Sequence, residues 1–108
     1  MNRHLIVRPE AEADITDAAL WYDSREPGLG LELTSEVHSA IARALKHPES
    51  FTRVRRNPTV RRVLTRRFPY RVFFIDRQDA LVVFAVLHAA QHDRIWKHRA
   101  EQSVRRRG

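Results

Sequence analysis

The stretch VRRVLTRRFPYRVFF, residues 60–74, decides the fold of this chain. Its apolar positions are valine, leucine, tyrosine and phenylalanine, and arginines alternate with them at a period of about two, which is typical of β-strands. Phe68-Pro69 interrupts the pattern, so the stretch predicts one strand over 60–67 and a second that begins at Tyr70. It also places five arginines inside the expected sheet.

A third strand follows in ALVVFAVLHAA, residues 80–90, after a turn at 76–79. This segment is apolar nearly throughout, as expected of a central strand that is covered on both faces. The connections between the three strands are too short for parallel crossovers. The strands are therefore predicted to form an antiparallel meander.

The first half of the chain predicts a short strand and a helical hairpin. LIV at residues 5–7 indicates the strand, and a proline followed by acidic residues favours a helix over 10–24. A second amphipathic pattern runs from Leu29 until Pro48 ends it, and the polar residues 48–59 predict a surface connection. The order of elements predicts an α+β domain in which the hairpin packs on one face of a small, mainly antiparallel sheet.

The C-terminal part predicts the end of a single domain. Residues 1–100 are expected to form that domain, and residues 101–108, which include a run of three arginines, a disordered basic tail. A short helical turn is expected before the tail. Trp96 is expected to cap the core, while Lys97 and Arg99 face solvent.

Charge is divided unevenly along the 108 residues, which carry a net charge of +7. Residues 1–50 hold five basic against nine acidic side chains, and residues 51–108 hold fifteen against four. This asymmetry predicts a basic surface for a polyanion or an acidic protein partner. Cysteine is absent, which excludes disulfides, thiolate metal sites and a cysteine nucleophile. The sequence has neither the pattern of a signal peptide nor an apolar run long enough for a membrane span, so we expect no membrane association.

The five arginines of residues 60–74 are the candidate polyanion ligands. Strand alternation predicts that Arg62 and Arg66 share one face of the sheet and that Arg61 and Arg67 share the other. Arg71 lies in the next strand among aromatic residues. Because one face should receive the helices, two or three of these guanidinium groups should line the open face, where they can bind phosphates in a bidentate fork.

Two histidines are the candidate acid–base groups. His88 ends the last strand and His92 follows four residues later. Histidine titrates near neutral pH, yet His88 can equally end a strand and hydrogen-bond a neighbouring carbonyl. Two histidines four apart bind one metal readily on a helix, whereas this pair spans a strand end and a loop. The sequence therefore predicts neither a metal nor a cofactor. Trp21 and Tyr22 are interpreted as packing residues between hairpin and sheet.

Three stretches together resemble the RelE/ParE superfamily of toxins from type II toxin–antitoxin systems, often described as plasmid stabilisation proteins. They are AEADITDAALWYDSREPGLGLEL at 11–33, the opening stretch at 60–74, and LVVFAVLHAAQHDRIWKHR at 81–99. The resemblance covers about Leu5–Arg99 and implies the same β-α-α-β-β-β fold.

The resemblance also implies a partner. It is a small cognate antitoxin of the ParD or RelB kind, whose C-terminal segment wraps the toxin in a hetero-oligomer. Trp21 and Tyr22 are candidate contacts for it. A member of this superfamily is expected to act in the bacterial cytoplasm.

One branch of the superfamily poisons DNA gyrase, and another cleaves messenger RNA on the ribosome. RNA-cleaving members usually carry lysines on the sheet and a tyrosine or histidine near the C-terminus, but this sheet has no lysine and neither residue follows His98. The ParE-like branch is therefore favoured, with a toxin that binds gyrase and has no catalytic residues of its own. The alternative is a ribosome-dependent mRNA endonuclease with His88, His92, Arg67 and Arg71 in catalytic roles. A third hypothesis is an inactive toxin fold that is retained to bind its antitoxin.

Overall fold

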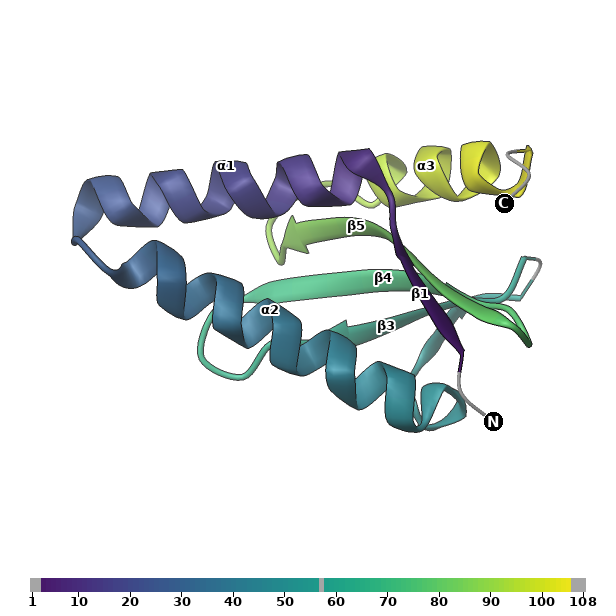
Figure 1. Ribbon diagram of the computed structural model, residues 1–108. Coiled ribbons are helices and arrows are strands. Elements are labelled where there is room, and N and C mark those ends of the chain that lie inside the picture. Colours follow the sequence, from purple (N-terminus) through teal and green to yellow (C-terminus); the bar gives the residue numbers. More distant parts are fainter. Residues whose placement is uncertain (1–2, 57, 106–108) are drawn as a thin grey trace.

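The computed structural model of the chain describes residues 3–56 and 58–105. Three α-helices, one short 3-10 helix and five strands make up these residues (Figure 1). In chain order they are β1 (His4–Val7), α1 (Pro9–Arg25), α2 (Leu29–Lys46), the 3-10 helix η1 (Pro48–Ser50), β2 (Arg53–Arg55), β3 (Val60–Leu64), β4 (Tyr70–Asp76), β5 (Ala80–His88) and α3 (Arg94–Arg105). The predicted α+β class, with a helical hairpin after the first strand, is confirmed.

A single five-stranded sheet organises the fold, with strand order β1-β5-β4-β3-β2. β3, β4 and β5 form the predicted antiparallel meander, and β1 adds to β5 in parallel. The prediction that residues 48–59 form only a surface connection is wrong, because β2 lies within them and pairs with β3. β2 has three residues, too few to show a strand period, and its ladder is broken by a register shift.

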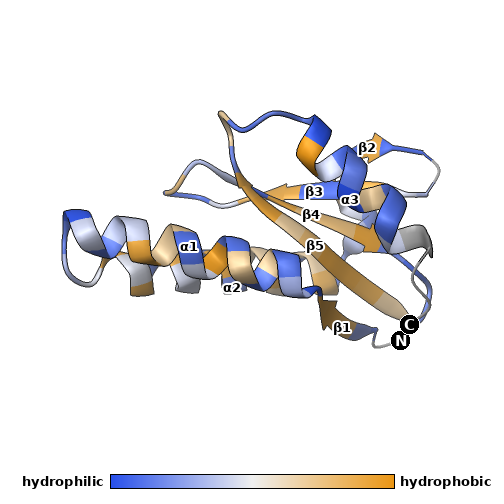
Figure 2. Cartoon of the chain, turned by 90° about the horizontal axis from the view of Figure 1, so that it is seen from above, coloured by the Kyte–Doolittle hydropathy of each residue, from blue (hydrophilic) through white to orange (hydrophobic). Residues whose placement is uncertain are grey.

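Helices cover both faces of the sheet. Figure 2 shows the α1–α2 hairpin on one side of the strands and α3 on the other. The hairpin buries Leu33 and Val37 against Phe74, while α3 stacks Trp96 on Phe73 with ring centroids 5.1 Å apart. Trp96 therefore closes the core as predicted. The second face, which was expected to be open, is covered where α3 crosses β5.

The end of the chain departs from its prediction. α3 continues to Arg105, so residues 101–105 are helical where a disordered tail was expected, and residues 106–108 lie outside the described part of the chain. α3 extends this far because a narrow stripe of small or apolar side chains packs against the sheet. Trp96, Ala100 and Ser103 recur at helical spacing and are buried, although the basic residues around them hide the pattern.

Two glycines explain the turn between α1 and α2. Gly28 has φ +96°, a left-handed conformation that residues with a side chain rarely adopt. A Cβ on Gly30 would lie 2.5 Å from the carbonyl oxygen of Ala19, so only glycine lets the helices approach this closely. The Asp23 carboxylate accepts the backbone N–H groups of Gly28 and Gly30 and so satisfies the first free donors of α2.

An ion pair seals the edge of β5 that β1 leaves uncovered. β1 pairs with β5 only as far as Val83. Beyond it, Asp14 of α1 accepts the N–H of Val86 at 2.9 Å, and Arg99 of α3 donates to the carbonyl of Phe84 at 3.4 Å. Asp14 and Arg99 also bind each other in a bidentate pair at 2.6 and 3.2 Å. Arg99, expected to face solvent, is instead an internal residue because this edge needs hydrogen-bond partners.

Replacing Asp14 by alanine should destabilise the fold strongly. The change leaves the Arg99 guanidinium and the Val86 N–H without their partner in a site where the paired side chains are only 15% and 20% exposed. We expect a loss of about 3 kcal/mol in the free energy of unfolding, measured by urea titration. Glu32→Ala, which breaks the exposed Glu32–Arg67 pair, should cost less than about 1 kcal/mol. Equal losses in the two variants would contradict this role of Asp14.

Candidate functional site

The turn between β3 and β4 carries two of the five candidate arginines. β3 ends at Leu64, so Arg66 and Arg67 lie in the turn, and the predicted alternation across the two faces of the sheet is wrong for them. Their backbone N–H groups both donate to Glu36 of α2 at 2.9 Å. The pKa of Glu36 is lowered, first by the hydrogen bond from Arg67. The α2 helix thus holds the turn in place.

The two turn arginines differ in what their guanidinium groups contact. Arg67 forms a 2.8 Å ion pair with Glu32 and lies over the ring of Phe68 at 5.6 Å. Arg66 is exposed and its side chain forms no salt bridge with any residue in the described ranges. Both line a hollow of about 300 Å³ together with Arg71. Three of the predicted ligands therefore meet where β3 ends and β4 begins.

Arg61 is a structural residue. Its guanidinium donates to the backbone carbonyl of Phe51 at 2.7 Å and to that of Glu49 at 3.4 Å. These bonds tie β3 to the segment that leaves α2. An arginine used in this way has little capacity left for a phosphate, and Arg61 stays a prediction as a polyanion ligand.

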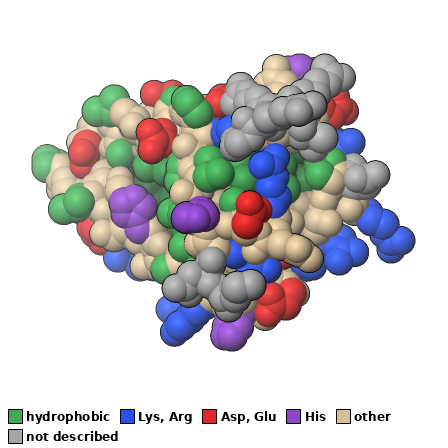
Figure 3. Space-filling model, turned by 45° about the vertical axis from the view of Figure 1, so that its right-hand side comes forward, with side chains coloured by type: hydrophobic (Ala, Val, Ile, Leu, Met, Phe, Trp, Pro, Cys, Tyr) green, Lys and Arg blue, Asp and Glu red, His purple; other side chains and the backbone are tan. Residues whose placement is uncertain are grey.

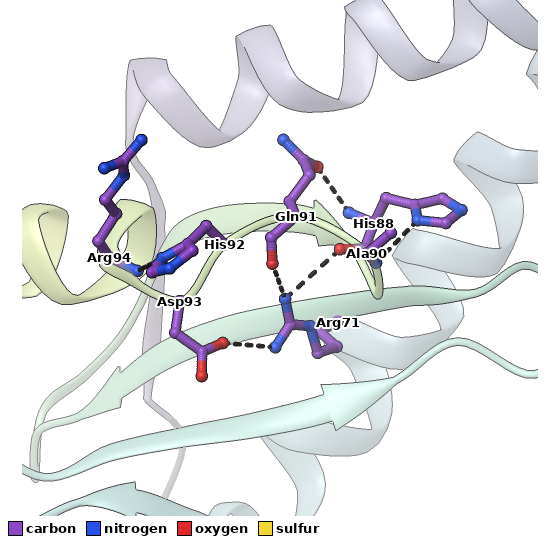
Figure 4. A network of polar contacts seen from close by, with 7 residues as sticks. All are labelled: Arg71, His88, Ala90, Gln91, His92, Asp93 and Arg94. Carbon is purple, nitrogen blue, oxygen red and sulfur yellow. Dashed lines mark hydrogen bonds and ion pairs between the residues drawn. The ribbon is translucent and has the colours of Figure 1, made fainter.

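Arg71 holds the loop between β5 and α3 (Figure 4). Its side chain is 11% exposed, and its guanidinium binds Asp93 at 3.0 Å and the carbonyls of Gln91 and His88 at 3.0 and 3.4 Å. The same guanidinium lies 5.2 Å from the ring of Phe73. The hydrogen bond from Arg71 is the main reason that the pKa of Asp93 is lowered, and a hydrogen bond with Trp96 lowers it further. Arg71 is thus a fixed charge at the start of α3.

Both candidate histidines use one ring nitrogen to stabilise their own loop. His88 Nδ1 accepts the N–H of Ala90 at 3.0 Å, and His92 Nδ1 accepts the N–H of Arg94 at 3.1 Å. A neutral ring that accepts at Nδ1 carries its proton on Nε2. In Figure 4 the two imidazoles point away from each other on either side of Arg71. The structure brings His88 beside Arg71, but it does not bring the two histidines into one site.

Arg62 differs from the other arginines of β3 and β4. It is half-buried on the face that α3 covers, and within the described residues its side chain forms no salt bridge. It lines a second hollow with Arg71 and Lys97. Lys97 comes from α3, of which the sequence predicted only a short helical turn, so the pattern did not indicate that Lys97 lies beside Arg62 and Arg71.

The aromatic pair on α1 has two different roles. Tyr22 packs edge-on against Phe68 and Tyr70 at centroid distances of 5.0 and 6.3 Å, as predicted. Burial is the first cause that raises the pKa of Tyr70 to about 12. Trp21 is 52% exposed, with Arg25 4.4 Å above its ring, so its interpretation as a packing residue is wrong. Helical spacing turns Trp21 away from the sheet while Tyr22 faces it.

An apolar groove lies on the other side of the molecule, where no site was predicted. It has a volume of about 320 Å³ and is formed by β1, α1 and α2. Its lining residues are Leu5, Val7, Glu12, Ile15, His38, Ile41, Ala42 and Leu45. The face in Figure 3 shows hydrophobic side chains gathered on the left and Lys and Arg side chains mainly along the right and lower edges. Three separate segments build the groove, so a pattern within one segment cannot reveal it.

The described residues form neither a metal-binding cluster nor a membrane-spanning helix. Within residues 3–56 and 58–105, no group of three or more histidine or acidic side chains is placed to hold a metal ion. No helix among the described residues has the length and apolar character needed to cross a bilayer.

Asp93→Asn tests the clamp that Arg71 makes on the loop. The change keeps the size of the side chain but removes the charge that Arg71 binds, so the amides of Gln91 and neighbouring loop residues should exchange with deuterium about five- to tenfold faster at pH 7. Because the folded-state pKa of Asp93 is lowered, the clamp is present above the ordinary aspartate range and is lost as the pH falls through that folded value.

Glu101→Gln is the matched control for this change. It removes an exposed carboxylate 4.0 Å from Arg55, outside the loop, and should leave loop exchange unchanged. Equal exchange in wild type and Asp93→Asn would show that Arg71 does not hold the loop through this pair.

The chain resembles known proteins both in its fold and in its sequence. The chain is similar to a solved structure titled "Chromosomal ParDE TA system from P. aeruginosa", with 16% sequence identity, a TM-score of 0.70, and coverage of 80% of this chain and 95% of the other. This likeness supports the fold. No curated protein matches the chain. Residues 5–93 match the family described as ParE toxin of type II toxin-antitoxin system, parDE. The predicted superfamily is thereby confirmed, and the chain belongs to the ParE toxin family.

Proposed function

We propose that this ParE-family toxin arrests bacterial growth by poisoning DNA gyrase and that a cognate antitoxin neutralises it. The observation that carries the proposal is that the candidate catalytic side chains already form hydrogen bonds within the fold. His88 and His92 each commit Nδ1 to a loop amide, and Arg71 is held by three acceptors. The side chains that remain for a target are cations, including Arg62 and Arg66. They favour a binding protein that acts in the cytoplasm, where gyrase works.

A ribosome-dependent mRNA endonuclease is the second candidate. It is favoured by one observation, namely that the ring of His88 lies beside Tyr70, at a centroid distance of 5.4 Å, and that the His88 carbonyl contacts Arg71. Cleavage of RNA without a metal needs both a proton acceptor and a proton donor at the scissile phosphate. His88 can supply one of them through Nε2. The opposed orientation of His92 argues against it as the other.

The apolar groove between β1, α1 and α2 is the site that we assign to the antitoxin. The outer edge of β1 is a sheet edge, so its backbone groups can accept a further strand, and the groove beside it takes apolar side chains. Leu5 is 44% exposed at this edge. An antitoxin segment that runs along β1 would bury these groups. The exposed Trp21 on α1 stays a candidate contact for the same partner.

Induction of the chain in bacteria, read together with a DNA-damage reporter, tests the target. Gyrase poisoning leaves broken DNA, so growth arrest should coincide with a strong reporter signal, and purified gyrase with the toxin should accumulate cleaved plasmid. The double variant His88→Ala, His92→Ala should remain toxic, because the proposal gives these side chains no chemical step.

Two other outcomes of this experiment would overturn the gyrase proposal. Arrest without DNA damage that also disappears in the histidine variant would replace gyrase by the ribosome. A folded chain that causes no arrest would support the inactive toxin hypothesis.

Ala42→Glu tests the antitoxin groove. Ala42 is exposed on α2 and lines the groove, so a glutamate there should place a charge in the apolar contact and weaken antitoxin binding about 100-fold or more, while toxicity is retained. Ala13→Glu is the matched control, since Ala13 is an exposed helical alanine of α1 outside the groove lining. Calorimetric titration with the antitoxin gives the affinities. Equal affinity for the two variants would place the antitoxin elsewhere.

A further inference from the structure

The hollow between α3 and the sheet is built differently from the other hollows of the molecule. It has a volume of about 280 Å³, and the stacked rings of Phe73 and Trp96 form one of its walls. Arg62 enters it from β3, Arg71 from β4 and Lys97 from α3. Three cations from three elements thus converge on one small volume.

The charges in this hollow do not cancel. Asp93 is the single carboxylate among its described lining residues, and Arg71 binds it at 3.0 Å. Neither Arg62 nor Lys97 forms a salt bridge with a residue in the described ranges, although the charge of Lys97 helps to lower the pKa of Asp93. Two positive charges therefore remain available for an anion, held against an aromatic wall.

Rigid surroundings make this hollow more than a patch of surface charge. Arg71 is pinned by three acceptors, and the ring of Trp96 is 4% exposed beneath Lys97, whose ammonium lies 5.7 Å from the ring centroid. The backbone of Arg62 is fixed by its N–H bond to Thr52 at 3.1 Å and by pairing with Phe73. Fixed anchors lower the ordering cost of binding a ligand.

We propose that this hollow binds a phosphodiester group of a nucleic-acid backbone, with Arg62 and Lys97 as its ligands and Arg71 as the fixed charge that positions the site. The inference deepens the proposed function and rests on it for the source of the phosphate, because DNA held by gyrase supplies such groups. RNA is the other source of the same chemistry. Lys97 lies beyond residues 5–93, the segment that matches the family, so the site depends on a helix outside that segment.

Fluorescence anisotropy with short labelled strands tests the site without gyrase. The probes are a DNA duplex, single-stranded DNA and single-stranded RNA of the same sequence, titrated with the full chain at several salt concentrations. Arg62→Gln and Lys97→Gln should each weaken binding several-fold and reduce the slope of log K against log salt by about 0.9 on duplex or about 0.7 on a single strand. Arg62→Lys keeps the charge and should keep the slope.

Lys46→Gln is the matched control, since Lys46 is an exposed cation at the end of α2 and should leave affinity and slope as in wild type. Melting curves verify that each variant is folded. If the wild type binds none of the three probes, or if the Arg62→Gln, Lys97→Gln double variant binds with unchanged affinity and slope, the site does not exist.

The gyrase proposal can fail separately. If the chain binds only RNA, and the two glutamine variants show the expected smaller salt slope, the site is supported and its ligand is RNA. DNA would then be excluded as the source of the phosphodiester group. A second result is that the toxin binds the strands and shows the expected smaller salt slope in Arg62→Gln and Lys97→Gln, yet causes no gyrase cleavage. That result would support the site and overturn the gyrase function alone.

Discussion

Asp14 and Arg99 lie 85 residues apart in the chain, and their ion pair closes the edge of the strand against which the two helical layers pack. β5 is buried on both faces from Ala80 to Leu87, so backbone groups left free at its edge would be costly. β1 is too short to cover that edge, and the two side chains complete it from opposite faces of the sheet. The same contact fixes α3, which in turn places Lys97 beside the arginines of the sheet.

The same need for hydrogen-bond donors explains part of the arginine content of residues 60–74. Four of the five arginines fall into two groups that differ in role, and the fifth, Arg67, pairs with Glu32. Arg61 and Arg71 are structural, because each donates hydrogen bonds to backbone carbonyls of neighbouring loops. Arg62 and Arg66 make no salt bridge with the described residues and keep their charge for a partner. The net charge of the second half of the chain therefore overstates the cationic surface that a target meets.

The parts of this fold that rest on periodicity could be predicted, and those that rest on single long-range contacts could not. The meander and the helical hairpin follow from apolar patterns that run over many residues. β2 is three residues long, and α3 has an apolar stripe so narrow that its basic residues hide it. The arginine and histidine candidates were identified by residue type, but which of them are engaged internally depends on carbonyls and carboxylates from distant segments. The family, in contrast, was accessible from three short stretches taken together.

The most direct test of the account measures each arginine separately. In a ¹⁵N NMR spectrum of the arginine side chains near neutral pH, the Nε–H protons of Arg61 and Arg71 should exchange slowly with water and give sharp signals, because these nitrogens are buried. Those of Arg62 and Arg66 should exchange faster, and the signal of Arg62 should shift when a phosphodiester strand is added. Uniformly fast exchange for all four, or a shift confined to Arg61 and Arg71, would contradict the division between structural and binding arginines.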